Sequence, residues 1–324
     1  MTWKWVALAA GSVAAVALAI AVGPVSLTPT DVILALRGRG DPTVGGIVRE
    51  LRVPRALIAF LVGGSLAVTG AALQALVRNA LADPYLLGLS GGAGLGAVAA
   101  IAAGVRGAWA VPAAAFAGAL LAITLVYRLA LVAAGAVESR LLILAGVVVG
   151  AFASAIMGAL LSVSQAPELR SALLWLLGGF QASSWLTVGV FTAYAVVPLA
   201  VIAAAHRALD LLTLGDEPAQ FLGADIGAVK RRVYLAASFL TAAAVAVSGI
   251  IGFIGLVVPH AIRLLLGHVH ATMLPAAFLL GGMLLVLADA AARTVVAPIE
   301  LPVGVVTALI GVPVFAVLLR RWIR

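Results

Sequence analysis

The stretch RALDLLTLGDEPAQFLGADIGAVKRR, residues 207–232, joins two long apolar halves of this chain and holds its densest group of charges. Four helix-breaking residues interrupt it: Gly215, Pro218, Gly223 and Gly227. We therefore expect two short helices joined by a glycine turn, with Asp216 and Glu217 where negative charge stabilises a helix start. The stretch is either a docking surface or a solvated connector, and its length, amphipathic pattern and glycine hinges favour docking.

The rest of the chain is dominated by apolar residues. Of 324 residues, 64% are hydrophobic and 10% are charged, and the mean hydropathy is +1.22. A soluble core of this size cannot hide so much apolar surface, so the composition predicts an integral membrane protein. Because about 20 apolar residues span a bilayer and the long runs do not alternate as barrel strands do, we expect an all-α polytopic fold with about ten transmembrane helices.

The predicted spans follow the apolar runs along the chain. Their approximate bounds are 5–23, 55–77, 86–103, 110–132, 141–163, 185–205, 233–251, 253–266, 273–292 and 303–319. The first run resembles a signal peptide, but it is long and no clear small-residue cleavage site follows, so we interpret it as an uncleaved span. Among the connectors, Thr30 and Asp31 are expected to cap a short helix through Leu36, residues 38–46 to form a loop, and residues near 172–177 a short helix.

An even number of spans places both termini on one side of the membrane. With that side cytoplasmic, more Lys and Arg residues fall inside than outside, as the positive-inside rule requires, and residues 207–232 are cytoplasmic. The formal charge of +8 comes from basic residues scattered at span ends, so nucleic-acid binding is not expected. The absence of cysteine excludes disulfides and thiolate metal ligands.

Two spans share a short echo. The sequence AVTG at residues 67–70 resembles AVSG at residues 246–249, and a Leu-Val pair follows each. These spans run in opposite directions in the predicted topology, so we expect an inverted repeat that pairs spans two to five with spans seven to ten, as in many transporters. In an alanine-rich chain such an echo also arises by chance.

The span at residues 141–163 carries a small residue at every fourth position: Gly146, Gly150, Ser154 and Gly158. These residues share one helix face. The stripe either lets another helix approach closely or lines a pathway. Ordinary packing within the chain explains it equally well.

Asp289 is the only acidic residue well inside a predicted span. Such a residue costs about 2.5–3.5 kcal/mol on insertion scales and is a functional candidate, while Arg293, four residues later, can pair with it on one helix face. Arg293 also lies on the same expected side as Arg49, Arg52 and Arg55. These arginines form either a rim for an acidic partner or ordinary snorkelling helix ends.

Nucleotide, hydrolytic and metal sites have weaker support. The glycine-rich residues 88–96 begin a membrane helix and follow no strand, and no P-loop sequence occurs, so any ATP is bound by another chain. Ser90 and His260 could form a hydrolase pair, but both positions suit helix packing better. His268 and His270 do not share a helix face, and no carboxylate lies near them in sequence, so a metal site is not expected.

Several motifs together resemble one family. They are LRVPR (51–55), ALADP (80–84) and LGLSG (87–91) in the first half, and GIIGFIGLVVPH (249–260), LAD (287–289) with Arg293 and ELPVGVVTALIGVPVF (300–315) in the second. Over nearly the whole chain they resemble the permease subunits of ATP-driven importers for iron-siderophores, haem and cobalamin. Ala80 departs from the family, which usually has proline after the asparagine; we expect a looser turn without loss of function.

The resemblance implies one transmembrane permease domain over residues 1–324, in the cell (inner) membrane, working as a homodimer with the pathway between the copies. Two cytoplasmic P-loop ATPase subunits would bind ATP and magnesium, so this chain would hold no cofactor and no catalytic residue. They would dock on residues 207–232 through the following positions: Gly215, Asp216, Glu217 and Gly223. A periplasmic or lipid-anchored binding protein would dock through Arg55 and Arg293, and a gate would lie at Asn79, Leu81 and Ser139.

The expected mechanism is alternating access driven by the ATPase pair, which moves a metal chelate (iron(III)-siderophore, cobalamin or haem) inward. Selectivity would lie largely in the binding protein, because no residue here chelates iron or cobalt. The main alternative is a secondary ion-coupled carrier with inverted repeats and coupling at Asp289. A membrane enzyme that depends on Ser90 and His260 is the third hypothesis.

Overall fold

The computed structural model describes residues 2–134, 138–223 and 225–322; at 86, 87, 133, 134, 139 and 318–322 only the backbone is described. Each predicted span corresponds to a helix: α1 (Thr2–Ala21), α4 (Val53–Leu76), α5 (Leu89–Ala102), α6 (Ala110–Ala134), α7 (Ser139–Val163), α9 (Trp185–Ala204), α12 (Ile226–Ser248), α13 (Ile254–Leu266), α14 (His270–Thr294) and α15 (Val303–Trp322). No strand occurs in the described ranges, and the all-α prediction is confirmed.

Shorter helices fill the connectors. They are α2 (Pro29–Leu36), α3 (Pro42–Gly46), α8 (Ala166–Leu176), α10 (His206–Leu214) and α11 (Asp216–Phe221), with a π-helical turn at Ile47–Arg52 and a 3-10 turn at Pro84–Leu87. Of the described helices, six segments are long and apolar enough to cross a membrane, and α5, α13 and α15 are shorter apolar helices. Helix α12 begins earlier than predicted because the charged residues before 233 continue the helix.

Two local predictions were wrong. The cap of α2 is Thr28, whose side chain accepts a hydrogen bond from the backbone N–H of Asp31 while the Asp31 carboxylate accepts one from the backbone N–H of Thr28. Residues 38–46 are not all loop, because Asp41 caps α3 and Pro42 occupies its first turn. Both corrections lengthen the helical connector that leads into α4.

Helix α4 lies at the centre of the bundle, where it packs against α1, α9, α12, α13 and α14. Every residue from 62 to 76 is buried. Glycines permit this packing: a Cβ at Gly70 would lie 1.9 Å from the carbonyl oxygen of Gly255, and one at Gly63 would lie 2.4 Å from that of Gly281. The helices thus meet backbone to backbone.

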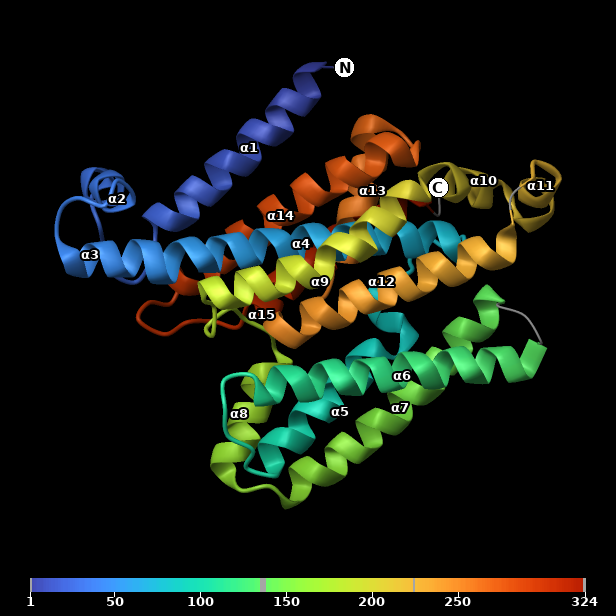
Figure 1. Cartoon of the computed structure of the whole chain (residues 1–324), viewed down its shortest axis with the longest axis horizontal. Helices are drawn as coiled ribbons and strands as arrows, with labels where there is room; N and C mark the ends of the chain where they lie inside the picture. Colours follow the sequence, from blue (N-terminus) through green and yellow to red (C-terminus); the bar gives the residue numbers. More distant parts are fainter. Residues whose placement is uncertain (1, 135–137, 224, 323–324) are drawn as a thin grey trace.

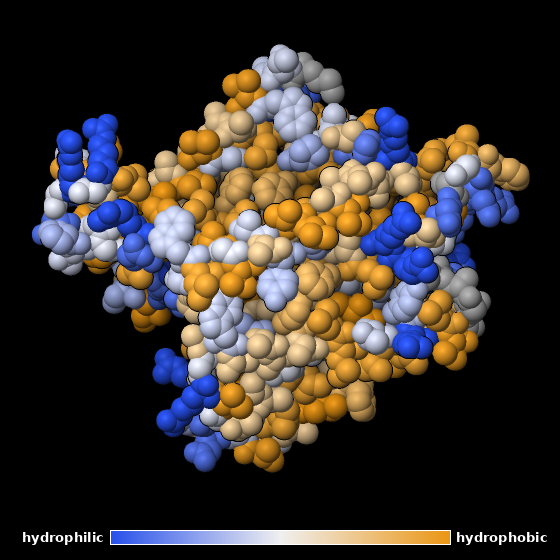
Figure 2. Space-filling model, viewed as in Figure 1, coloured by the Kyte–Doolittle hydropathy of each residue, from blue (hydrophilic) through white to orange (hydrophobic). Residues whose placement is uncertain are grey.

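Figure 1 shows α5, α6, α7 and α8 grouped on one side of this central set, with α1 on the opposite side. Helices α2, α3 and α8 lie toward one end of the molecule, and α10 and α11 lie at the other. Hydrophilic residues gather toward these two ends, with apolar surface between them (Figure 2). This is the distribution that a bilayer-spanning protein requires.

Helices α4 and α12 run in opposite directions (Figure 1), as the predicted repeat requires. The short echo is not matched in local structure, however. Gly70 lies inside α4, whereas Gly249 has φ +66° and ends α12. The inverted repeat therefore stays a prediction.

Candidate functional site

The charged stretch folds as predicted into α10 and α11, joined at Gly215 with φ +120°. Leu209 and Leu212 bury one face of α10, which packs against α4 and α14. The Asp210 carboxylate accepts hydrogen bonds from the backbone N–H and ring Nδ1 of His270 at 2.9 and 2.6 Å. Helix α10 is thereby fixed to the start of α14.

Helix α11 is fixed by a charge pair. The Asp216 carboxylate accepts a hydrogen bond from Lys230 Nζ at 2.7 Å and lies 3.8 Å from Arg78 Nη2. The Lys230 side chain is only 4% exposed, and a buried ammonium group is stable only with such a partner. Because Lys230 lies on α12 and Arg78 follows α4, these contacts tie α11 to two central helices.

The outer surface of this segment combines one acid with exposed apolar side chains. Glu217 is exposed and makes no ion pair within the described chain. Phe221, Leu214 and Leu222 are 90%, 63% and 62% exposed, and Gly223 has φ +86°. The predicted Gly215, Asp216, Glu217 and Gly223 thus lie in one compact segment. The sequence patterns do not indicate these three apolar residues as a contact surface, although the amphipathic pattern of α10 places Leu214 opposite the buried Leu209 and Leu212.

The turn after α4 holds two of the predicted gate residues. The Asn79 side-chain oxygen accepts a hydrogen bond from the backbone N–H of Leu81 at 2.9 Å, and Arg78 has φ +52°. A Cβ on Gly215 would lie 3.5 Å from Arg78 Nη1, so this turn adjoins α11. Ser139 begins α7, and its side chain lies outside the described residues.

At the opposite end, Arg55 and Arg293 are held in an ion-pair network. Arg55 Nη2 lies 3.0 Å from Asp289 Oδ1 and Nη1 lies 3.0 Å from Glu300 Oε2. Arg293 Nε lies 3.1 Å from Asp289 Oδ2, which confirms the pairing predicted for residues four apart. The Arg55 and Arg293 side chains are only 12% and 3% exposed. Both therefore make intramolecular pairs instead of an open rim, and their role in docking stays a prediction.

Two arginines of the expected rim also complete the end of α1. Arg52 donates hydrogen bonds to the carbonyl oxygens of Ile20 and Ala21 at 3.0 and 2.7 Å. Arg293 donates to the Ala19 carbonyl oxygen at 3.1 Å. The last carbonyls of a helix have no partner inside it, and they carry partial negative charge. These buried cations therefore anchor α1 to α4 and α14.

The small-residue stripe on α7 divides into two parts. A Cβ at Gly88 would lie 2.8 Å from the Gly146 carbonyl oxygen, and one at Gly91 would lie 3.0 Å from the Gly150 Cα. This half therefore serves packing within the chain. Ser154 and Gly158 are exposed, and a Cβ at Gly158 would meet nothing within 4 Å. Only this second half is free for another chain or a pathway.

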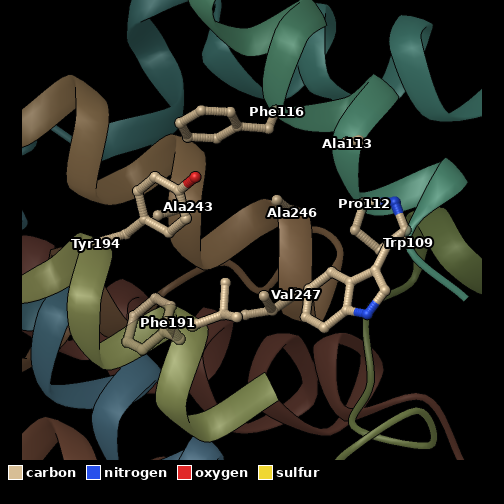
Figure 3. A pocket seen from close by; sticks show the side chains of 10 residues that line it. Trp109, Pro112, Ala113, Phe116, Phe191, Tyr194, Ala243, Ala246 and Val247 are labelled. Atoms are coloured by element: carbon tan, nitrogen blue, oxygen red, sulfur yellow. The ribbon is translucent and has the colours of Figure 1, made fainter. Parts of the chain in front are cut away.

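An aromatic cleft of about 200 Å³ lies between α6, α9 and α12. Figure 3 shows Trp109 and Phe116 facing Phe191 and Tyr194 across it, with Ala243 and Ala246 leaving space between them. Ligand pockets for compact organic molecules usually have about 300–1,000 Å³, so this cleft is too small for a bulky chelate. A neighbouring cavity of about 690 Å³, which includes Glu300 in its lining, falls within that range.

Three comparisons with known proteins agree on the family of this chain. The sequence model of the FecCD transport family matches residues 11–321. The chain is 44% identical over 274 residues (85% of this chain, 73% of the relative) to the cobalamin import system permease BtuC of Halobacterium salinarum. It is 41% identical over 278 residues (84% and 82%) to the hemin transport system permease HmuU of Yersinia pestis.

Among solved structures, a metal-chelate-type ABC transporter in an inward-facing conformation matches with a TM-score of 0.89 and 28% identity, over 99% of this chain and 100% of that one. In the described residues, no three His, Asp or Glu side chains are arranged to hold a metal ion. Because the family model matches residues 11–321 and both named relatives align over most of the chain, the chain belongs to the FecCD transport family and is a transmembrane permease subunit, with ATPase activity in a separate subunit.

Proposed function

We propose that two copies of this chain form the membrane channel of an ATP-driven importer for a metal chelate. The relatives named for cobalamin and hemin support this substrate class, and iron(III)-siderophores belong to the same chemical class. The observation that carries the proposal is the exposed segment α10–α11, where an unpaired acid and three apolar side chains are anchored to the central helices. Such a segment suits a cytoplasmic partner whose own movement shifts the central helices.

Two ATPase subunits dock on this segment, which lies in the cytoplasm together with both chain termini in a cell (inner) membrane. Closure of the ATPase pair on ATP moves α11, and the Asp216–Lys230 pair passes this movement to α12. Arg78 passes it to the turn with Asn79 and Leu81, where the gate opens or closes with Ser139. The charge pairs therefore couple ATP binding to alternating access.

A binding protein docks at the opposite end and delivers the substrate. Arg55 keeps partial exposure and pairs with Glu300, which is 28% exposed and lines the 690 Å³ cavity. A carboxylate of the binding protein would compete with Glu300 for Arg55. Arg293, buried beneath it, supports this docking through Asp289.

Purification from native membranes in mild detergent, followed by mass spectrometry, tests the proposal. We expect a P-loop ATPase at one copy per permease. Glu217→Lys should lose this partner, whereas Glu50→Lys, the same charge change at an exposed position at the other end, should keep it. A permease that moves solute into liposomes without ATP or any partner would contradict the proposal and would make Asp289 the residue to study.

A further inference from the structure

A polar pocket of about 490 Å³ lies between the end of α4, helix α10, the second half of α13 and the start of α14. Its lining carries five side chains that are or can become cationic: Arg78, His260, Arg263, His268 and His270. No carboxylate is among the described residues that line it. The nearest acids are already engaged, Asp210 with His270 and Asp216 with Lys230 and Arg78.

Arg263 is held at this pocket by a neutral group. The Gln74 side chain, 3% exposed, donates from Nε2 to the carbonyl oxygens of Ala82, Gly255 and Leu256, each at 3.3 Å. Its Oε1 therefore turns to Arg263 and accepts a hydrogen bond from Nη2 at 2.5 Å. In the described chain no carboxylate lies within ion-pair distance of Arg263. The neutral Gln74 partner uses one guanidinium donor of Arg263, and the remaining donors face the pocket side where an anion could bind.

The pocket opens beside an apolar edge. Leu264, Leu265 and Val269 are 66%, 52% and 57% exposed, and Lys4 Nζ donates to the Leu265 carbonyl oxygen at 2.6 Å. Helices α10 and α13 lie near the same end of the molecule (Figure 1). Cations next to exposed leucines at the end of apolar helices mark the boundary between hydrocarbon and water.

We propose that this pocket binds the phosphate headgroup of an anionic phospholipid, with the acyl chains along Leu264 and Leu265. Guanidinium groups match phosphate oxygens in geometry and charge, and basic pockets between membrane helices suit anionic headgroups. The exposed leucines favour a lipid over a soluble phosphate. The inference rests on the proposed function only in assigning the pocket to the cytoplasmic leaflet.

Lipid retention measures this binding directly. The permease alone is placed in nanodiscs with equal dioleoyl phosphatidylglycerol and phosphatidylcholine, and native mass spectrometry then counts the lipids it keeps. We expect the wild type to keep phosphatidylglycerol preferentially. Arg78→Gln and Arg263→Gln should each lower this retention about fivefold, Arg263→Lys should lower it less, and Arg231→Gln, an exposed arginine of α12 outside the pocket, should not change it.

Equal retention of the two lipids by the wild type, or wild-type retention by both Gln variants, would overturn the proposal. Arg78 is about half exposed, so its variant stays informative if Arg263→Gln fails to fold. Inorganic phosphate is the second probe. If phosphate raises the melting temperature of the detergent-purified wild type while the nanodiscs show no lipid preference, the ligand is a soluble phosphate and the lipid assignment is wrong. Because no ATPase is present, failure of the importer proposal would leave these results unchanged.

Discussion

Asp289 lies inside a span, where an acid is a candidate for ion coupling. Its carboxylate is only 1% exposed, however, and lies between the guanidinium groups of Arg55 and Arg293. A buried charge that loses its partner is costly, and in this network Asp289 joins two arginines while Arg55 joins two carboxylates. The two guanidinium groups thus supply the charge compensation that an acid inside a span requires.

Replacing Asp289 tests this directly. Asp289→Asn should destabilise the detergent-purified protein by about 3–5 kcal/mol, because it leaves the buried Arg293 without a carboxylate and Arg55 with Glu300 alone. Thermal unfolding measures the effect. Glu300→Gln is the control and should cost less, because Glu300 is 28% exposed and its removal leaves Asp289 paired with both arginines. Equal stability of Asp289→Asn and wild type would show that the ion-pair network does not contribute to the free energy of unfolding.

Gly70 is the second residue on which the packing depends. In Gly70→Ala the new Cβ would lie 1.9 Å from the Gly255 carbonyl oxygen, so α4 and α13 would have to separate. We expect little folded protein in size-exclusion chromatography after membrane extraction. Gly189→Ala on α9, where a Cβ meets nothing within 4 Å, should fold at least as well as wild type, since alanine favours a helix by about 1 kcal/mol.

At the scale of elements, α11 is a short helix whose inner side is ionic and whose outer side is apolar. The glycine breaks in residues 207–232 predicted two short helices, and the structure confirms them. The sequence could not predict which charge anchors α11, because Lys230 follows Asp216 by fourteen residues and reaches it only after the chain turns back. Likewise, nothing local in the sequence shows that Gln74 orients Arg263.

Phe221 should be the main apolar contact of α11 with the ATPase, because exposed aromatic side chains dominate interface energies. Phe221→Ser is expected to reduce ATPase co-purification at least tenfold, a loss of about 1.4 kcal/mol or more. The amount of ATPase per permease on gels or by mass spectrometry measures this. Leu36→Ser, an exposed apolar residue at the other end, serves as the control and should keep the ATPase; equal recovery from both variants would exclude Phe221 from the contact.

For the whole molecule, the composition was enough to predict an all-helical membrane fold, and each apolar run became one helix. It did not reveal that α4 is buried along its length while α1 and α7 are largely exposed, since their hydropathies are similar. The sequence predicted the Asp289–Arg293 pair, which lies on one helix. It could not predict that Arg52 and Arg293 bind the end of α1 or that Arg55 pairs with Asp289, because these partners lie on elements distant in sequence.

A homodimer around α7 makes a prediction that the chain is well suited to test, because it contains no cysteine. Under mild oxidation Gly158→Cys should form a disulfide-linked dimer on non-reducing gels, since Gly158 lies exposed on the open half of the stripe. Gly189→Cys on α9 should stay monomeric. Cross-linking of both variants alike, or of neither, would contradict an α7-centred dimer.

ATP-driven uptake by proteoliposomes measures whether this permease works as part of an importer. The permease is reconstituted with its co-purified ATPase and binding protein, and accumulation of labelled cobalamin, haem or iron-siderophore is followed with and without ATP. We expect ATP-dependent accumulation of one of these chelates by the wild type and by Glu50→Lys, and none by Glu217→Lys although that variant remains folded. Uptake by Glu217→Lys at the wild-type rate, or uptake that does not require ATP, would contradict this expectation.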